Sequence, residues 1–252
     1  MCGRYSLFAP PADIEERFDT RFAFEFEPRY NAAPRQSLPV IPDDSPGTIS
    51  AMEWGFVPPW ADSRDDFGFI NARAETLAEK PTFRAAFRAG GEAGDNGESG
   101  GGDLRAGRCL VPADGFYEWV ETGDGRQPYR VTLADGEPFA MAGLYAEYRP
   151  ARTQTGLGDF GDGGPDAGTE TVTTYAIVTT EPNDLVADLH DRMSVILPRG
   201  EERRWLHEGT AVVGELLGPY PSDEMRAEPV SRAVNDPSND SPAVLDGPDT
   251  AR

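Results

Sequence analysis

The residue at position 2 is the most reactive group that the sequence offers. Cys2 directly follows Met1, and an initiator methionine is normally removed when the next side chain is small. The mature chain then begins with an α-amine and a thiol on one residue. Such a 1,2-aminothiol condenses with an aldehyde: the amine forms an imine, and the thiol adds to the imine carbon to close a thiazolidine ring. The thiol can also act as an acyl nucleophile with its own amine as the base.

Position 2 alone does not decide among these reactions. A cysteine at a frayed chain end can also be there by chance. The sequence context therefore has to show whether further reactive groups accompany Cys2.

Glu118 is a second candidate, because it lies in the aromatic run Phe116-Tyr117-Glu118-Trp119. On a strand, its side chain would point away from those of Tyr117 and Trp119. A carboxylate in an apolar cleft has a raised pKa and can serve as a general acid or base. The alternative is an exposed glutamate on an edge strand.

The chain has two histidines, His190 and His207. We expect His190 near the C-terminal end of a helix, where the helix dipole favours the protonated imidazole. We interpret His207 as structural. Asn71 and Arg73 lie two positions apart, so on an extended segment their side chains would face the same side.

Charge limits the functions that the chain can have. Its 252 residues carry a formal net charge of −21. Lys80 is the only lysine in the sequence, so the other positive charges come from arginine. Such a surface argues against general affinity for nucleic acid, which depends on basic side chains, although a local cleft lined by arginine is compatible with it. We take the acidity as a hypothesis of adaptation to high salt, which screens the repulsion among carboxylates. The alternative is an acidic protein from an ordinary environment.

The two cysteines, Cys2 and Cys109, form no metal-binding spacing, and we expect neither a metal nor a cofactor. Cys109 lies in an apolar run and is expected to be an inert core residue. A disulfide between the two would consume the terminal thiol. The sequence has no apolar run long enough to cross a membrane and no signal peptide. We therefore expect a soluble protein of the reducing cytoplasm.

Short strands interrupted by helices are predicted along the chain. Apolar and β-branched runs indicate strands at residues 38–41, 50–54, 109–111, 115–120, 129–133, 139–148 and 171–180. Apolar residues three or four positions apart indicate helices at residues 12–18, 81–88, 183–190 and 201–207. The sequence Ala-Asp-Gly after residue 133 predicts a hairpin, and Asn183 is expected to cap its helix.

This pattern favours the α+β class, with a curved antiparallel-rich sheet or an open β-barrel core and flanking short helices, over a regular βαβ array. We expect one domain over residues 1–240. Glycine-rich acidic insertions at about 89–103 and 151–170 are expected to be flexible surface loops, and residues 241–252 a disordered tail.

Several sequence blocks together resemble one known family. They are Met1-Cys2-Gly3-Arg4, WGFVPPWA from Trp54, NARAET from Asn71, CLVPADGFYEW from Cys109 and HDRM from His190. In this order they resemble the SRAP proteins, the SOS response-associated peptidases, which are also called abasic-site processing proteins. The resemblance runs from Met1 to about Asn239, interrupted by the two glycine-rich insertions.

The resemblance implies that Cys2 cross-links to abasic sites in single-stranded DNA, whose open sugar carries an aldehyde. It implies that Glu118 and His190 transfer protons and that Asn71 hydrogen-bonds the N-terminal cysteine or the sugar. Further residues are expected to bind DNA: Gly3 by close backbone approach, Arg4, Arg73 and Arg192 at phosphates, Thr179 through its hydroxyl and Trp119 by stacking on a base. Each arginine can instead pair with a carboxylate of the protein.

Three functions stay open at this point. The first is a DNA-damage protein, expected to be a monomer, that traps abasic sites covalently through Cys2. The second is a cysteine peptidase or amidase, which can include removal of its own Met1. The third is a module that binds single strands without a covalent bond.

Overall fold

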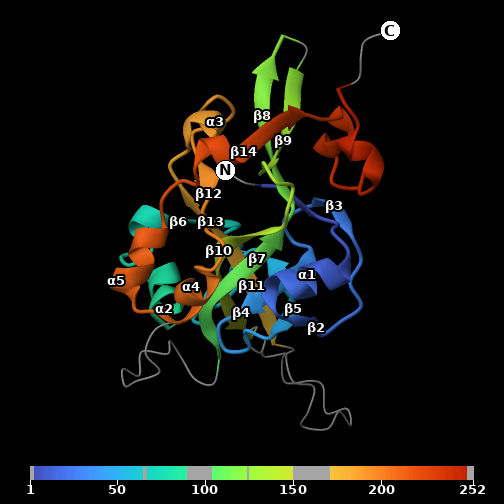
Figure 1. Cartoon of the computed structure of the whole chain (residues 1–252). Coiled ribbons are helices and arrows are strands. Elements are labelled where there is room, and N and C mark those ends of the chain that lie inside the picture. Colours follow the sequence, from blue (N-terminus) through green and yellow to red (C-terminus); the bar gives the residue numbers. More distant parts are fainter. Residues whose placement is uncertain (1–2, 65–66, 90–103, 124, 150–170, 249–252) are drawn as a thin grey trace, which may run out of the picture.

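The computed structural model describes residues 3–64, 67–89, 104–123, 125–149 and 171–248. Within these ranges the chain forms two sheets with short helices packed around them (Figure 1). The strands pair mostly antiparallel. The predicted α+β class, rich in antiparallel strands, is therefore confirmed.

The smaller sheet holds the N-terminal strand. Its strands are β1 (Tyr5–Leu7), β3 (Arg29–Ala32), β8 (Gly115–Thr122), β9 (Gly125–Leu133) and β14 (Met225–Pro229). They lie in the order β14-β9-β8-β1-β3. β1 is therefore held between β8 and β3 although it has only 3 residues.

The larger sheet has the order β12-β11-β10-β7-β4-β5-β2. These strands are β2 (Arg21–Phe22), β4 (Ser37–Pro42), β5 (Thr48–Trp54), β7 (Ala106–Ala113), β10 (Phe139–Tyr148), β11 (Val172–Thr180) and β12 (Met193–Ser194). Two short strands join it at the side: β6 (Asn71–Arg73) pairs parallel with β11, and β13 (Ile196–Leu197) pairs with β10. β11 is buried along most of its length, as its β-branched sequence predicts.

Helices surround the larger sheet in Figure 1. The α-helices are α1 (Pro11–Phe18), α2 (Pro81–Ala89), α3 (Asp184–Ala187), α4 (Glu202–His207) and α5 (Thr210–Val213). Single turns of 3-10 helix are η1 (Ala74–Thr76), η2 (Gly214–Leu216), η3 (Ser222–Glu224), η4 (Arg232–Asn235) and η5 (Pro242–Leu245). None of the helices in the described ranges combines the length and the apolar character of a membrane span.

The main core lies between the sheets and helices and includes the fully buried rings of Trp54 and Trp205. A smaller cluster joins Tyr117 of β8 to Val230, Val234 and Val244 of the C-terminal segment. In Figure 1 this segment, coloured red, lies beside the β8–β9 hairpin. The C-terminal segment is therefore packed against the sheet that holds the N-terminal strand.

The predicted hairpin between residues 129–133 and 139–148 is wrong. A turn does form, because Gly136 N–H donates to the carbonyl of Leu133 at 3.1 Å. The two strands then enter different sheets. Both edges of β9 are already paired, with β8 and β14, while β10 pairs with β7 and β11.

Two further expectations differ from the structure. Asn183 does cap a helix, but α3 ends at Ala187 and not at His190, because the chain must turn there before Met193 pairs with Thr180. The tail expected from residue 241 is ordered as η5, where Val244 is 1% exposed. Burying a valine contributes roughly 1.5 kcal/mol, which favours this docking.

The two glycine-rich insertions are mostly beyond what the structure describes. Ala89 is the last residue of α2, while residues 90–103 and 150–170 lie outside the described ranges. Residues 249–252 of the expected tail also lie outside them.

Candidate functional site

Glu118 is a buried carboxylic acid in the middle of β8. It is 2% exposed, and burial, with a smaller contribution from the negative charge of Asp191, raises its pKa to about 7. Burial acts because a carboxylate loses hydration in apolar surroundings. Near neutral pH this group can therefore both donate and accept a proton. The alternative of an exposed edge-strand glutamate is wrong.

Side chains alternate along β8 as expected for a strand. Tyr117 and Trp119 pack in the small C-terminal cluster, whereas Phe116 belongs to the main core. Glu118 therefore lies on the same side of β8 as Phe116, away from Tyr117 and Trp119.

The N-terminal segment runs alongside β8. Tyr5 pairs with Phe116, and the backbone N–H of Tyr117 donates to the carbonyl oxygen of Arg4 at 3.0 Å. This antiparallel register places Gly3 and Arg4 beside the part of β8 that holds Glu118. Cys2 itself lies outside the described residues.

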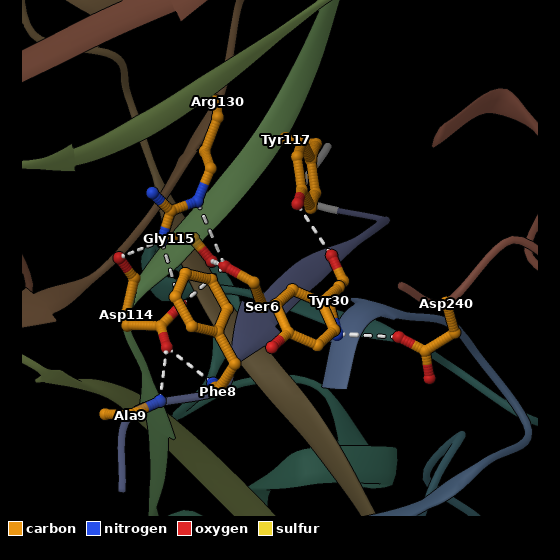
Figure 2. Close-up of polar contacts among 9 residues, drawn as sticks. All are labelled: Ser6, Phe8, Ala9, Tyr30, Asp114, Gly115, Tyr117, Arg130 and Asp240. Carbon is orange, nitrogen blue, oxygen red and sulfur yellow. Dashed lines mark hydrogen bonds and ion pairs between the residues drawn. The ribbon is translucent and has the colours of Figure 1, made fainter. Parts of the chain in front are cut away.

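A buried network around Asp114 fixes this register (Figure 2). One carboxylate oxygen accepts from the Ser6 hydroxyl at 2.6 Å and from Arg130 Nη2 at 3.0 Å. The other accepts from the backbone N–H groups of Phe8 and Ala9 at 2.5 and 3.0 Å. Arg130 also donates from Nε to the Ser6 hydroxyl at 3.2 Å. One carboxylate thus holds three residues of the N-terminal segment at the start of β8.

The sequence analysis did not identify this network. The glycine was the signal that a close contact exists there. A Cβ at Gly115 would lie 2.6 Å from Arg130 Nε, so only glycine lets the guanidinium pack against the backbone.

Aromatic stacking extends the network to β3. Figure 2 shows the Phe8 and Tyr30 rings face to face, with centroids 4.8 Å apart. The Tyr117 hydroxyl donates to the carbonyl of Tyr30 at 2.6 Å, and Asp240 accepts from the backbone N–H of Tyr30 at 2.6 Å. The C-terminal segment therefore helps to hold β3 against β1.

His190 lies just after α3 in the segment that leads to Met193. Burial lowers its pKa below the ordinary value. Its Nδ1 accepts from the backbone N–H of Arg192 at 2.9 Å and lies 2.9 Å from Asp191 Oδ1. The expected protonation by a helix dipole is wrong, since α3 ends before His190.

His190 and Glu118 lie in one electrostatic environment. After burial, the charges of Asp191 and Arg126 both act on the pKa of each group. Both groups therefore lie within electrostatic range of Asp191 and Arg126.

Polar side chains line the junction of β6, β11 and β12. Arg73 pairs with Thr179 and Asn71 with Ile177 across β6 and β11, and Thr179 pairs with Ser194 across β11 and β12. Directly paired residues share one face of a sheet. Asn71, Arg73 and Thr179 are thus on one face, as expected, and Ser194 is an addition that the sequence analysis missed.

Exposure differs sharply within this group. Arg73 is exposed, whereas Thr179 and Ser194 are fully buried. In the part of the chain that the structure describes, neither hydroxyl has a hydrogen-bond partner.

Arg192 is held by an acidic neighbour. Its Nη1 and Nη2 donate to the two carboxylate oxygens of Glu75 at 2.6 and 2.9 Å, and Nη2 also donates to the carbonyl of Thr179 at 2.7 Å. The alternative that this arginine pairs with a carboxylate of the protein is therefore realised in the structure.

Arg4 and Trp119 contact the C-terminal segment. Arg4 Nη1 donates to Asn31 Oδ1 and to the carbonyl of Val234, both at 2.8 Å. Trp119 Nε1 donates to Asn235 Oδ1 at 2.6 Å. These bonds give Arg4 a structural role, which the sequence analysis considered only as the general alternative of a salt bridge.

Other features of the described residues lie apart from this cluster. Cys109 is fully buried, and burial raises the pKa of its thiol well above the ordinary value, as expected for an inert core residue. No group of three His, Cys, Asp or Glu side chains in the described ranges is arranged to hold a metal ion. A hollow of about 1200 Å³ lies beside α1 and α4, and none of the described site residues named above from the sequence lines it.

The chain belongs to the SOS response associated peptidase (SRAP) family, whose sequence profile matches residues 1–91 and 102–237.

Several relatives align over almost the whole chain. The abasic site processing protein YoqW of Bacillus subtilis is 37% identical over 98% of this chain and 99% of its own. The abasic site processing protein YedK of Escherichia coli is 27% identical over 95% of this chain and 96% of its own. The abasic site processing protein HMCES of Xenopus tropicalis is 27% identical over 97% of this chain and 78% of its own.

Solved structures share the fold. A protein from Bacteroides thetaiotaomicron superposes with a TM-score of 0.76 at 24% identity, covering 98% of this chain and 99% of that one. A protein from Bordetella bronchiseptica superposes with a TM-score of 0.71 at 26% identity, covering 91% and 100%.

Proposed function

We propose that this protein processes abasic sites in DNA by forming a covalent cross-link to them through Cys2. One observation supports this most directly. The backbone pairing of Arg4 with Tyr117 holds the N-terminal segment beside the strand that carries Glu118, a buried acid whose pKa is about 7. Relatives over nearly the full length carry the name abasic site processing protein.

The proposed reaction needs only the terminal residue and two proton carriers. After removal of Met1, the amine of Cys2 attacks C1′ of the open sugar and forms a carbinolamine. Loss of one water gives an imine, and the thiol then adds to the imine carbon while its proton moves to the nitrogen. No external oxidant or reductant is needed, and the thiazolidine resists hydrolysis better than the imine.

Protons must move at each of these steps. Glu118 is proposed to donate to the ring oxygen of the sugar and so to favour the aldehyde, because its pKa lies near neutral pH. His190 is proposed to transfer protons at the imine step. Asn71 is proposed to hydrogen-bond the Cys2 amine or the sugar.

DNA binding is proposed to rest on a few groups around this centre. Exposed Arg73 is the most accessible phosphate ligand among the candidates, and Trp119 offers a ring for base stacking. Gly3, Arg4, Thr179 and Arg192 complete the proposed set. We propose single-stranded DNA as the substrate, a monomer as the active form, and a cytoplasmic, nucleoid-associated location.

Denaturing electrophoresis tests the proposal. Protein with a processed N-terminus is incubated with an abasic single-stranded oligonucleotide and with the same oligonucleotide lacking the lesion. We expect a denaturation-resistant adduct for the wild type with the abasic strand only, and none for Cys2→Ala. An adduct of equal yield in Cys2→Ala would contradict the proposal.

Removal of Met1 by the protein itself is a second proposed activity, supported by the family's description as peptidases. Expression of Glu118→Ala without an external aminopeptidase, followed by mass spectrometry, tests it. Retained Met1 in the variant and processed wild type support self-processing. Processing of both forms excludes a role for Glu118 in this step.

Adaptation to high salt is a separate hypothesis, based on the net charge of −21. It predicts that the melting temperature rises as KCl increases from about 0.1 M to about 2 M, since salt screens repulsion among carboxylates. A melting temperature that falls over this range would contradict it.

A further inference from the structure

Arg192 presents both terminal nitrogens of its guanidinium to one carboxylate. Nη1 and Nη2 donate to the two oxygens of Glu75 at 2.6 and 2.9 Å. The side chain of Arg192 is 14% exposed and that of Glu75 is 51% exposed. The carboxylate therefore covers the fork from the solvent side. This two-oxygen geometry is the one by which arginine also binds a phosphate.

Glu75 lies between two arginines. It belongs to η1, directly after β6, which ends at Arg73. Its pKa is lowered mainly by the hydrogen bonds from Arg192, with a further contribution from the charge of Arg73. In the described ranges no carboxylate lies within ion-pair distance of Arg73 itself. Arg73 and Arg192, which are both candidates for binding DNA phosphates, thus interact with the same carboxylate, Glu75.

Arg192 keeps its place without Glu75. Its Nη2 also donates to the main-chain carbonyl of Thr179 at 2.7 Å. Its Nε is buried, so the inner half of the guanidinium is enclosed by protein. Because Glu75 is half-exposed and Arg192 has this second partner, loss of Glu75 is expected to cost little stability.

We infer that Glu75 determines specificity: its carboxylate occupies the phosphate-binding fork of Arg192 and weakens non-covalent binding of intact single strands. Lasting attachment of the protein to DNA then depends on the covalent bond at an abasic site. This inference rests on the proposed function, since it takes DNA phosphate as the ligand of Arg192. It goes beyond the proposed function because it assigns to Glu75 the weakening of phosphate binding at Arg192.

A positioning role for Glu75 predicts the opposite effect. If Glu75 mainly oriented Arg192 for phosphate, its removal would weaken DNA binding. If Glu75 competes with phosphate, its removal strengthens binding. The sign of the change therefore separates the two roles.

Binding of a labelled oligothymidylate without any lesion provides the test. It is measured with Cys2→Ala protein, so that no covalent step contributes. We expect Glu75→Gln in this background to lower Kd by about three- to tenfold at low salt, with a gain that shrinks as KCl increases, because one more phosphate contact steepens the salt dependence. An unchanged or higher Kd overturns the inference.

Glu137→Gln is the matched control. Glu137 is 57% exposed, close to the exposure of Glu75, and faces Arg199 at 3.9 Å, so this change removes the same unit of charge from an equally exposed glutamate elsewhere. We expect little change in Kd for it. An equal gain in both variants would assign the effect to net charge and overturn the inference.

The double variant Glu75→Gln/Arg192→Gln tests the assignment to Arg192. We expect the gain in affinity to disappear in it, and persistence of the gain contradicts the inference. A competition between abasic and intact strands for cross-linking protein then measures selectivity, which is expected to fall in Glu75→Gln. The Kd for an intact strand is measured without any cross-link. The result for Glu75 can therefore be interpreted even if the protein forms no covalent adduct.

Discussion

The backbone N–H of Tyr117 donates to the carbonyl oxygen of Arg4 at 3.0 Å. This bond continues the β1–β8 pairing past Tyr5, so that the segment leading back to residue 2 runs antiparallel to the strand bearing Glu118. The described start of the chain, Gly3 and Arg4, is therefore held against β8. Changes that loosen β1 should slow the reaction even when they lie far from the reacting atoms.

Asp114→Asn should both destabilise the fold and slow cross-linking. Asp114 is 6% exposed and pairs with Arg130 at 3.0 Å while accepting three further bonds from the N-terminal segment. Breaking a buried pair leaves an uncompensated charge and costs about 3 kcal/mol. Urea unfolding and single-turnover cross-linking rates, measured well below the melting temperature, check both effects.

Glu202→Gln is the control that distinguishes an effect on the placement of β1 from a general loss of stability. Glu202 forms a comparably buried ion pair with Arg17, at 2.6 Å, but it lies on α4 and not at β1. We expect it to lower stability without slowing cross-linking. Equal losses of cross-linking rate in Asp114→Asn and Glu202→Gln would show that the hydrogen bonds of Asp114 have no specific effect on the pairing of β1 with β8.

Glu118→Gln should stabilise the protein at alkaline pH. The pKa of Glu118 is raised from 4.5 to about 7 in the fold, so between these values the folded chain binds more protons than the unfolded chain. Wild-type stability is therefore lost as pH rises through this window. The variant is expected to be more stable by up to about 3 kcal/mol near pH 8 and by little near pH 4.

The same variant should react more slowly. Glutamine cannot transfer a proton, so the loss in cross-linking rate is expected to be about 100-fold, within the usual range for a general acid. Chemical denaturation across pH and rate measurements at fixed pH check the two expectations. A stability difference that does not vary with pH would mean that Glu118 is not buried as a carboxylic acid.

Asn183→Ala should loosen the segment that leads to His190. Asn183 Oδ1 accepts from the N–H of Val186 at 2.9 Å, and its Nδ2 donates to the carbonyl of Tyr220 at 2.7 Å. Loss of a helix cap costs about 1 kcal/mol. Asn183→Ser keeps a cap acceptor and loses the donor to Tyr220, so its effect on urea unfolding should be smaller. A larger loss for serine than for alanine would contradict this assignment.

Arg4→Lys and Arg73→Gln should differ in what they change. Arg4 binds Asn31 Oδ1 and the carbonyl of Val234, so its replacement is expected to lower stability by about 1–2 kcal/mol. Arg73 is exposed, so its replacement should weaken binding of single-stranded DNA without changing the melting temperature. A loss of stability in Arg73→Gln, or a loss of DNA binding without a loss of stability in Arg4→Lys, would contradict these roles.

The sequence predicts local elements well where burial and periodicity act within one segment. The β-branched run before Thr180 forms β11, and Asn183 caps α3. The turn at Gly136 is also local and forms. Its strands separate because partners distant in sequence, β14 and β7, pair with β9 and β10, and no local signal encodes that competition.

The site shows the same division. Residue types and a family resemblance pointed to Glu118 and His190, which share one electrostatic environment. The partners of the arginines could not be predicted, because Asp114 with Arg130 and Glu75 with Arg192 pair across different elements. Arg192 and Glu75 are 117 residues apart, so nothing in their spacing indicates contact.

Borohydride dependence of the adduct tests the central claim most directly. An imine is trapped only when it is reduced, whereas a closed thiazolidine survives denaturation without reduction. Wild type is expected to give an adduct with an abasic single strand in the absence of borohydride. Cys2→Ala, which keeps the terminal amine but lacks the thiol, should give one only in its presence. A borohydride-independent adduct of Cys2→Ala, or a tandem mass spectrum that places the sugar on another residue, would contradict the account.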